Sequence, residues 1–515
     1  MLEISGDGLT LADAESVLRG QVSVLHLTPQ ARRRVEKSRR CLEKLATTGK
    51  TIYGVNTGFG KLSNQRIDAS EIDQLQVNLL RSHAVGLGPL LDSGVARLAL
   101  TLRTQALAKG YSGVTTALIE QLCELFNRGI TPAIPEQGSV GASGDLSPLA
   151  HLALVAIGEG LVLPPDSDDA VRRKLLSGAV ALKRAGLQPY RLQAKEGLAL
   201  INGTQISTAL LADAAVRARR LAKLADIAGA MTVEATKSSL RPFDERIQKI
   251  RPHPGQITCA ANLRRLLADS EIMVSHAECS KVQDAYSMRC MPQVHGSFRD
   301  ALGHVTRVVE CEMNSATDNP LVFADEGEVI SGGNFHGQPI ALSADLLAAA
   351  LADLSSIAER RVENLVNPDL SGLPGFLTPR PGLNSGMMLV QVLAAALVSE
   401  NKSLSFPASV DSIPTSANRE DHVSMSTAAA RKARQVAANA ERVLACEFLC
   451  AAQGLEFHRP LRAGIGAEAA YRHIREIVPP LQADRTLHRD LEAVETLVRT
   501  GSLLDVVEGA CSPLQ

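Results

Sequence analysis

The stretch GSVGASGDLSPLAH, residues 138–151, is the most informative part of this 515-residue sequence. Three glycines within its first seven residues predict a tightly turned loop, because glycine adopts backbone conformations that other residues avoid. Asp145 and Ser147 stand where the loop becomes apolar, which is typical of the first turn of a helix. The stretch lacks the Lys-Ser/Thr ending of a P-loop and the glycine spacing of a dinucleotide fingerprint. A simple helix-capping loop is the plain alternative.

The tripeptide Ala142-Ser143-Gly144 inside this loop allows a chemistry that no standard side chain supplies. If the backbone nitrogen of Gly144 attacks the carbonyl of Ala142, a five-membered ring closes. Loss of two waters, one of them carrying the Ser143 hydroxyl, leaves an exocyclic methylidene conjugated with the ring carbonyl. Small residues at both ends let the loop bend this far, since glycine has no Cβ to block the approach. The product would be an electrophile.

The extended stretch resembles the signature of the ammonia-lyases and aminomutases that depend on a methylidene-imidazolone (MIO) group. Five further segments resemble motifs of the same family, so the resemblance covers most of the chain. They are YGVNTGFG (53–60), AKEGLALINGT (194–204), VQDAYSMRC (282–290), GGNFHG (332–337) and NREDHVSM (418–425). The resemblance implies an enzyme whose MIO group is made from Ala142-Ser143-Gly144, with no external cofactor and no metal.

The resemblance also implies how the reaction is catalysed. In the family, the MIO group takes the substrate amine as a covalent adduct and makes it leave more readily. A base must remove the weakly acidic β-proton, and Tyr53 matches the family's catalytic tyrosine, which can act only where its surroundings favour the ionised form. Catalysis is therefore assigned to Tyr53 together with Ala142, Ser143 and Gly144. Asp145 is expected to help ring formation by hydrogen bonding.

Other matched positions are expected to bind the substrate or to support the MIO group. Arg289 carries a planar fork of donors that suits the substrate carboxylate. Asn202 and Gln283 match the family's polar contacts to the carboxylate and to the ring oxygen, where hydrogen bonds stabilise developing negative charge. Tyr286 matches a second catalytic tyrosine, which supports the MIO group and proton transfer. Phe335 matches an aromatic residue that shapes the loop for ring closure.

Two positions bear on the substrate. Ser82-His83 and Glu420 resemble the histidine-specific enzymes, in which an acidic residue meets the imidazole ring. A carboxylate suits an imidazole N–H, whereas an unpaired carboxylate buried against a benzene ring is costly. Arg419 departs from the glutamine that is usual in the histidine enzymes. If Arg419 entered the site it would neutralise Glu420, and if it pointed away it would change nothing.

The resemblance thus implies non-oxidative deamination of L-histidine to trans-urocanate and ammonia. One alternative is a phenylalanine or tyrosine ammonia-lyase, or an aminomutase, on the same scaffold. A more remote alternative is a non-catalytic helical scaffold that binds ligands or partners. The family resemblance further implies a homotetramer whose active sites draw residues from three chains.

Helical patterns dominate the rest of the sequence. A helix is predicted from the Thr28-Pro29 cap to Gly49, and extended helices are predicted over 205–237, 339–366 and 427–457. Residues 345–351 are apolar around much of the helix, which indicates burial on several sides.

Two shorter segments complete the secondary-structure prediction. Residues 381–399 predict a buried core helix rather than a membrane span, because polar residues interrupt the apolar run. Strand signals are few, and the best is a hairpin of 321–323 and 329–330 around the turn 325–327.

These patterns predict a mainly α protein with a long-helix central bundle, a smaller N-terminal region that carries the MIO loop, and few short strands. We expect a single ammonia-lyase unit over residues 1–515. Within it, residues 1 to about 200 would form the MIO-bearing region. Residues from about 201 to 515 would form the bundle and the C-terminal helices.

Composition narrows the partners and the compartment. Lys plus Arg is 54 and Asp plus Glu is 55, so a net charge of −1 argues against a general nucleic-acid or membrane-surface binder. Nine cysteines without zinc-type spacing indicate reduced thiols in a cytosolic protein. The first 20 residues carry four acidic residues and do not resemble a signal peptide. We therefore expect a cytoplasmic enzyme that acts on a small amino acid.

Overall fold

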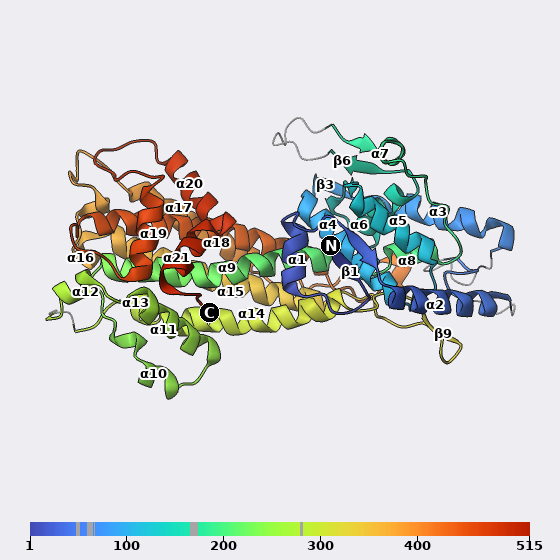
Figure 1. The fold of residues 1–515 in the computed structure, drawn as a ribbon, viewed down its shortest axis with the longest axis horizontal. Helices are drawn as coiled ribbons and strands as arrows, with labels where there is room; N and C mark the ends of the chain where they lie inside the picture. The colour runs from blue at the N-terminus through green and yellow to red at the C-terminus, as the bar shows by residue number, and fades with distance from the viewer. Residues whose placement is uncertain (48–51, 59–64, 66, 165–173, 279–281) are drawn as a thin grey trace. The chain divides into compact units, whose positions relative to one another are not determined.

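The computed structural model describes residues 1–47, 52–58, 65, 67–164, 174–278 and 282–515. Helices dominate these residues and strands are few and short (Figure 1), which confirms the mainly α class. The chain divides into two compact units that interleave along the sequence. Unit 1 comprises Met1–Ala214, Thr306–Asp345 and Pro407–Arg431, and unit 2 comprises Ala215–Val305, Leu346–Phe406 and Lys432–Gln515. The predicted division of the chain into two regions at about residue 200 remains a prediction.

Four of the five unit boundaries fall within long helices, and the fifth, between Phe406 and Pro407, follows α17 (Met388–Leu404). The four long helices are α9 (Gln205–Ala235), α14 (Met291–Met313), α15 (Gln338–Val366) and α18 (Ser426–Glu456). Three of them, α9, α15 and α18, agree with the predicted extended helices to within two residues at each end. Such long runs are predictable because they contain few breakers and keep one apolar face throughout.

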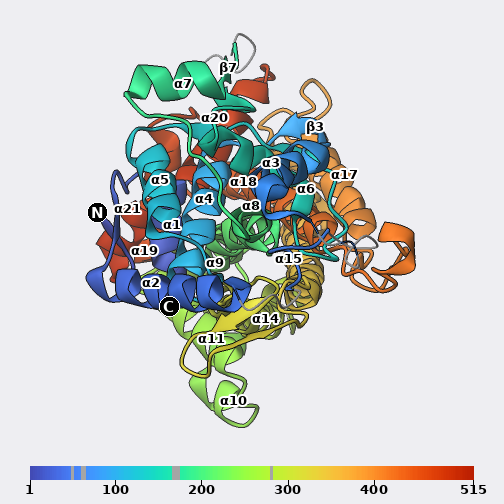
Figure 2. The same ribbon diagram turned by 90° about the vertical axis from the view of Figure 1, so that its right-hand side faces the viewer.

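Unit 1 contains all the strands of the described residues and a group of shorter helices. In chain order its elements are β1 (Leu2–Ile4), α1 (Leu11–Leu18), β2 (Leu25–Leu27), α2 (Pro29–Thr47), η2 (Ala69–Glu71), α3 (Ile72–His83), β3 (Leu87–Leu90), α4 (Ser93–Ala108), α5 (Thr116–Asn127), β4 (Thr131–Pro132), β5 (Pro135–Gln137), α6 (Leu146–Ala156), β6 (Leu161–Leu163), β7 (Leu176–Ser177), α7 (Gly178–Ala185), α8 (Glu196–Ile201), β8 (Leu321–Phe323), β9 (Glu328–Ile330) and η5 (Ser416–Asn418). Helix α4 packs beside α1 and α5 in the core of this unit (Figure 2).

Side-chain caps explain where several of these helices begin. The Thr28 hydroxyl accepts a hydrogen bond from the backbone N–H of Ala31 at 3.3 Å, and α2 starts at Pro29 as predicted. Its predicted end at Gly49 lies outside the described residues, which follow α2 to Thr47. Asp92 and Thr115 cap α4 and α5 in the same way. A side-chain oxygen at this position satisfies an N–H that has no partner within the helix.

The strands form four small sheets. β1 pairs with β2 in parallel, β3 pairs with β5 antiparallel, and β4, β6 and β7 form an antiparallel sheet. β8 and β9 form the predicted hairpin, with Leu321 opposite Ile330 and Phe323 opposite Glu328. The other strands are two to four residues long, and such short segments leave little alternation for a sequence pattern to reveal.

Unit 2 contains parts of the four long helices together with shorter helices of its own. Its own elements are η3 (Arg241–Phe243), α10 (Glu245–Lys249), α11 (Pro254–Leu266), α12 (Glu271–Ser275), α13 (Tyr286–Arg289), α16 (Pro368–Ser371), η4 (Gly375–Leu377), α17 (Met388–Leu404), α19 (Ile465–Arg475), α20 (His488–Thr500) and α21 (Ser502–Cys511).

Helix α17 corrects the prediction of a buried core helix over 381–399. The helix begins only at Met388, because Pro381 and Gly382 favour a turn before it. Val390 and Ala394 are buried, but Leu389 is 63% exposed. Only one face of α17 is therefore buried within this chain.

A buried ion pair lies in the core of unit 2. Arg361 donates two hydrogen bonds to the Glu447 carboxylate, at 2.6 and 2.8 Å, and neither side chain is accessible to solvent. Arg361 also lies 3.3 Å from Nε2 of His295, whose Nδ1 is 2.8 Å from the Asp226 carboxylate. Because Arg361 can only donate, Nε2 must accept and the proton resides on Nδ1. The network therefore holds His295 neutral.

Acid should destabilise the protein partly through His295. Burial lowers the pKa of His295 from 6.5 to about 4, whereas the unfolded chain takes up this proton near 6.5. The stabilisation is thus complete above about pH 6.5 and is lost as the pH falls towards about 4. His295→Gln keeps a donor for Asp226 and an acceptor for Arg361 but cannot be protonated. Urea midpoints measured across this pH range should fall less in the variant, and equal falls would contradict the assignment.

Candidate active site

The loop of residues 138–145 is held in a tight turn by its own hydrogen bonds. The Ser139 hydroxyl accepts from the backbone N–H of Gly141 at 3.1 Å. The same hydroxyl lies 3.3 Å from the Gly144 carbonyl and 3.3 Å from the Asp145 carboxylate, to either of which it can donate. These contacts close the turn that contains the Ala142-Ser143-Gly144 segment.

A second constraint is the close approach of Gly144 to Gly203. Gly144 has φ +71°, and a Cβ built on it would lie 2.2 Å from the Gly203 carbonyl oxygen. The next residue, Asp145, donates its backbone N–H to the same oxygen at 2.7 Å. A side chain at 144 would therefore strain the backbone and also collide with it. The loop and the 194–204 motif meet here, so position 144 accepts glycine alone.

Asp145 ties the loop to the beginnings of two long helices. One oxygen of its carboxylate accepts from the backbone N–H groups of Ile206 and Ser207, at 3.0 and 2.8 Å, and from the Ser207 hydroxyl at 2.9 Å. The other oxygen accepts from the Thr427 hydroxyl at 2.7 Å. Burial raises the pKa of Asp145, although these hydrogen bonds act in the opposite direction. The first turn of α9 is a favourable place for this carboxylate, because the N–H groups of a first turn have no partner within the helix and carry partial positive charge.

Two other predicted motifs pack against the same loop. The Gly141 carbonyl accepts from the Ser424 hydroxyl at 2.8 Å and from the backbone N–H of Gly337 at 3.2 Å. The Val140 carbonyl accepts from the backbone N–H of Met425 at 2.8 Å. The 332–337 and 418–425 motifs are thus neighbours of the loop although they lie far away in sequence. Phe335, in the first of these motifs, is half-buried.

Glu420 is the residue that contacts Ser143 directly. The Ser143 hydroxyl donates to Oε1 of Glu420 at 2.6 Å, and the Thr415 hydroxyl donates to Oε2 at 2.6 Å. Arg419 is exposed, and the two hydroxyls already occupy the carboxylate. This arrangement favours the case in which Arg419 leaves Glu420 unneutralised.

His83 lies close enough to Glu420 to sense its charge. Its Nδ1 lies 2.8 Å from the Leu79 carbonyl in the last turn of α3, so the ring donates from Nδ1 and presents Nε2 as an acceptor. Burial lowers the pKa of His83, while the Leu79 carbonyl and the Glu420 carboxylate oppose this effect. Unit 1 therefore holds the predicted residues His83, Ser143 and Glu420, of which Ser143 and Glu420 are in direct contact.

Asn202 lies among buried polar and charged side chains, and the sequence motif did not predict these surroundings. Its side chain donates to the Asn319 carbonyl at 3.1 Å, and among the described residues its buried Oδ1 has no hydrogen-bond partner. The Arg103 side chain, which is fully buried, donates to the Asn202 carbonyl at 3.0 Å. Lys195 and Asp318 form a buried ion pair at 2.7 Å beside it. The one available signal was Arg103, which is the single charged residue within residues 98–108 of α4.

Tyr53 lies in a turn in which side chains accept hydrogen bonds from backbone N–H groups of the same turn. The Asn56 side chain accepts from the backbone N–H of Ile52 at 2.8 Å, and the Thr57 hydroxyl accepts from that of Gly54 at 3.1 Å. Tyr53 itself is half-buried in unit 1. The last two residues of this motif, 59 and 60, lie outside the described residues.

The remaining predicted residues, Gln283, Tyr286 and Arg289, belong to unit 2. Tyr286 begins α13 and is 70% exposed, and the Arg289 guanidinium lies 4.4 Å from the centre of its ring. Gln283 and Arg289 line a cavity of about 690 Å³ in this unit. The predicted site residues are thus divided between the two units, with these three in unit 2 and the others in unit 1.

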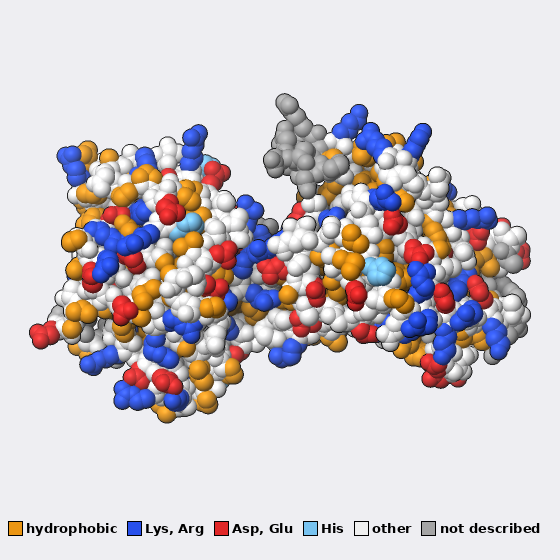
Figure 3. Space-filling view, in the orientation of Figure 1, with side chains coloured by type: hydrophobic (Ala, Val, Ile, Leu, Met, Phe, Trp, Pro, Cys, Tyr) orange, Lys and Arg blue, Asp and Glu red, His pale blue; other side chains and the backbone are white. Residues whose placement is uncertain are grey.

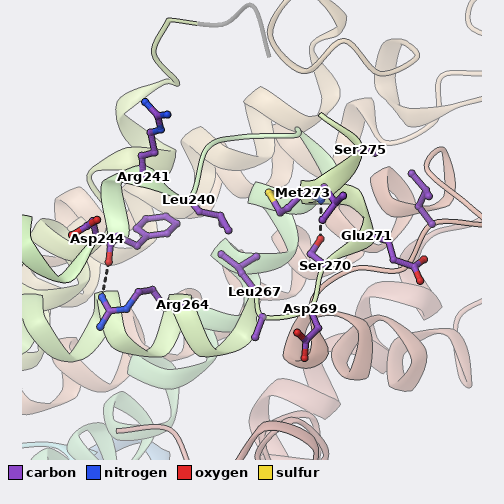
Figure 4. A pocket seen from close by; sticks show the side chains of 14 residues that line it. Leu240, Arg241, Asp244, Arg264, Leu267, Asp269, Ser270, Glu271, Met273 and Ser275 are labelled. Atoms are coloured by element: carbon purple, nitrogen blue, oxygen red, sulfur yellow. Dashed lines mark hydrogen bonds between the residues drawn. The ribbon is translucent and has the colours of Figure 1, made fainter. Parts of the chain in front are cut away.

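A larger cavity of unit 2, of about 950 Å³, contains none of the predicted site residues (Figure 4). Its walls include Leu240, Leu267 and Met273, with Asp244 and Arg264 at one side. Arg264 donates to the Phe243 carbonyl at 2.5 Å and so helps to hold the wall together. Size alone therefore does not identify the catalytic site in this chain.

One group in unit 2 has the residue types of a metal site. Ligand atoms of Asp226, Cys259 and His295 lie within 4.8 Å of one another, and all three residues are buried. However, Arg299 donates to Asp226 at 2.8 Å and Arg361 lies 3.3 Å from His295. Two guanidinium groups at these distances supply the positive charge that a metal ion would otherwise provide. The group is better explained as a hydrogen-bonded part of the core.

Comparison with known proteins identifies the family. A family model described as aromatic amino acid lyase matches residues 9–476. The chain is 53% identical over 509 residues to a histidine ammonia-lyase of Stigmatella aurantiaca, covering 99% of this chain and 98% of the relative. Its structure resembles a histidine ammonia-lyase from Trypanosoma cruzi (TM-score 0.91, 42% identity, 99% and 95% of the two chains). It also resembles a tyrosine aminomutase from Streptomyces globisporus (TM-score 0.93, 38% identity, all of both chains). The sequence-based resemblance is thereby confirmed, and the chain belongs to the aromatic amino acid lyase family.

Proposed function

We propose that this chain deaminates L-histidine to trans-urocanate and ammonia, using an MIO group formed from Ala142-Ser143-Gly144. The contact that carries the proposal is the 2.6 Å hydrogen bond between the Ser143 hydroxyl and Glu420, with His83 close by. In this proposal Glu420, which contacts Ser143, would bind the imidazole beside the residue that would become the electrophile. The names of the relatives at about 53% identity support the same substrate.

The residues of the loop fit the formation of an MIO group. The contact between Gly144 and the Gly203 carbonyl leaves no room for a side chain, and the Ser139 hydroxyl draws the ends of the turn together. The family needs no external cofactor, and in this chain the group would supply an electrophile for the substrate amine. Asp145 would hold the loop in place during ring closure.

The other residues would bind the substrate and move its β-proton. Glu420 would accept the imidazole N–H, and His83 would pack beside the ring and present its Nε2 atom. Arg289 and Asn202 would hold the substrate carboxylate. Tyr53 would remove the β-proton.

We also propose that the enzyme is a homotetramer whose sites draw residues from three chains. Tyr286 is 70% exposed, which is unusual for a catalytic tyrosine in a finished site. Helix α17 exposes an apolar face, with Leu389 63%, Val392 49% and Leu393 39% exposed. Exposed apolar faces of this kind mark contact surfaces between subunits.

A cytoplasmic location without nucleic-acid or membrane partners is part of the same proposal. Figure 3 shows Lys and Arg side chains interspersed with Asp and Glu side chains on one face of each unit, with no continuous basic stripe there. Among the described residues one helix, α15, is long and apolar enough to cross a membrane, and 56% of its most apolar window is buried within the structure. Burial of this kind suits a central helix of a bundle.

The cofactor can be tested by mass. The purified chain should weigh two waters less than its sequence requires, and the deficit should map to the peptide that contains Ala142, Ser143 and Gly144. Ser143→Ala removes the hydroxyl that must leave, so it should lower turnover by several orders of magnitude without changing the thermal midpoint. An active enzyme with an unmodified peptide would refute the proposal.

The substrate can be tested by turnover of L-His, L-Phe and L-Tyr, followed through the ultraviolet absorbance of the conjugated acid. We expect product from L-His alone. His83→Leu should reduce kcat/KM for L-His about tenfold or more, because the ring loses a polar neighbour, and should shift preference towards L-Phe. Cinnamate or coumarate as the main product of the unaltered enzyme would keep the chemistry but refute the substrate.

Shared active sites can be tested by complementation. Ser143→Ala alters unit 1 and Arg289→Ala alters unit 2, and each variant alone should be nearly inactive. If sites combine residues from different chains, co-expression should assemble some intact sites and restore a measurable fraction of the activity. Light scattering after gel filtration should give four times the mass of one chain. A fully active monomer, or mixed assemblies without restored activity, would contradict the proposal.

A further inference from the structure

Each oxygen of the Glu420 carboxylate accepts a hydrogen bond from a different hydroxyl group. Ser143 donates to Oε1 and Thr415 donates to Oε2, each at 2.6 Å. Distances this short are typical of hydrogen bonds from a hydroxyl to an ionised carboxylate. Thr415 is not among the residues that the sequence motifs single out, because it lies three residues before the 418–425 motif.

The backbone from Thr415 to Glu420 forms a turn that two backbone hydrogen bonds close. The N–H of Thr415 donates to the Glu420 carbonyl at 3.0 Å, and the N–H of Glu420 donates to the Thr415 carbonyl at 3.3 Å. The intervening Ser416, Ala417 and Asn418 all have left-handed backbones, with φ of 51°, 51° and 61°. Three successive non-glycine residues adopt this conformation only where their surroundings enforce it. The turn therefore holds the Thr415 hydroxyl at a fixed place opposite Glu420.

Formation of the MIO group would remove the Ser143 hydroxyl and leave the Thr415 hydroxyl in place. Dehydration of Ser143 breaks its Cα–H and Cβ–Oγ bonds, forms a Cα=Cβ double bond and releases one water. The donor to Oε1 then no longer exists, whereas Thr415 still donates to Oε2. The carboxylate would be left with one oxygen held and one oxygen open beside the new double bond.

We infer that Thr415 is a positioning residue for substrate recognition: it holds Glu420 through Oε2, so that Oε1, released when Ser143 is dehydrated, accepts the imidazole N–H of the substrate. This inference rests on the proposed function. Until Ser143 is dehydrated, its hydroxyl occupies the acceptor that the substrate would use. Ring formation would therefore create the electrophile and expose the ring-binding oxygen in one event.

The test compares Thr415→Val with Thr415→Ser and with Ser412→Ala. Valine keeps the shape of threonine but removes the donor, while serine keeps the hydroxyl. Ser412 is a matched control, because it lies in the same segment and its hydroxyl accepts from the Val423 backbone at 3.0 Å without bonding Glu420. Each protein is analysed for its two-water mass deficit, its thermal midpoint, kcat and KM for L-His, and inhibition by urocanate.

We expect Thr415→Val to retain the mass deficit and the thermal midpoint. Its KM for L-His and its inhibition constant for urocanate should both rise about tenfold or more, with a smaller change in kcat, because a donor to a charged group is lost. Thr415→Ser should restore both constants, and Ser412→Ala should match the unaltered enzyme.

Three results would overturn the inference. If Thr415→Val bound L-His and urocanate as the unaltered enzyme does, Thr415 would not position Glu420. If the variant lost the mass deficit, the hydroxyl would serve maturation of the loop instead of recognition. If the unaltered enzyme made no urocanate at all, the proposed function would fail first and the inference with it.

Discussion

The loop of residues 138–145 depends on a single buried carboxylate. Asp145 accepts hydrogen bonds from the first turn of α9 and from the Thr427 hydroxyl at the start of α18, and its own backbone N–H bonds the Gly203 carbonyl. A carboxylate is costly to bury, so it persists here only because several donors surround it. It fixes the loop relative to two long helices, and Gly203, Ser424 and Met425, which contact the loop, lie just before the first residues of these helices.

Behind the loop, buried charge supports the strand-like segment of Asn202 and Gly203. Arg103 holds the Asn202 carbonyl, and the pair of Lys195 and Asp318 lies beside it without access to solvent. Burial lowers the pKa of Arg103 to about 10, with Asp318 opposing the effect. Removing one partner of such a group would leave an uncompensated charge in the core. The backbone against which Gly144 packs is therefore held by the buried Arg103 guanidinium, with one buried ion pair beside it.

Much of the fold could be predicted from the sequence, and several of the motifs predicted to form the site do meet at the loop in unit 1. The long helices and the hairpin at 321–330 follow from patterns that lie entirely within a short window. The face exposed by α17 and its late start at Met388 could not be predicted, because an apolar helix has the same sequence whether its neighbour is its own chain or another. Thr415 and the pairing of Lys195 with Asp318 were also missed, since each depends on contacts that local sequence does not encode.

By itself the sequence indicated the family, and it predicted the candidate site: the Ala-Ser-Gly tripeptide and its flanking motifs are the segments expected to form the electrophile and bind an amino acid. It could do so because reactive groups are short, local patterns of residue types. Only the tertiary structure decided how these groups are arranged. It brought Ser143 and Glu420 into contact in unit 1 and paired each Glu420 oxygen with a different hydroxyl. It placed Gln283, Tyr286 and Arg289 in unit 2. These relations span hundreds of residues, and they arise from the packing of helices and buried charges rather than from the order of residues along the chain.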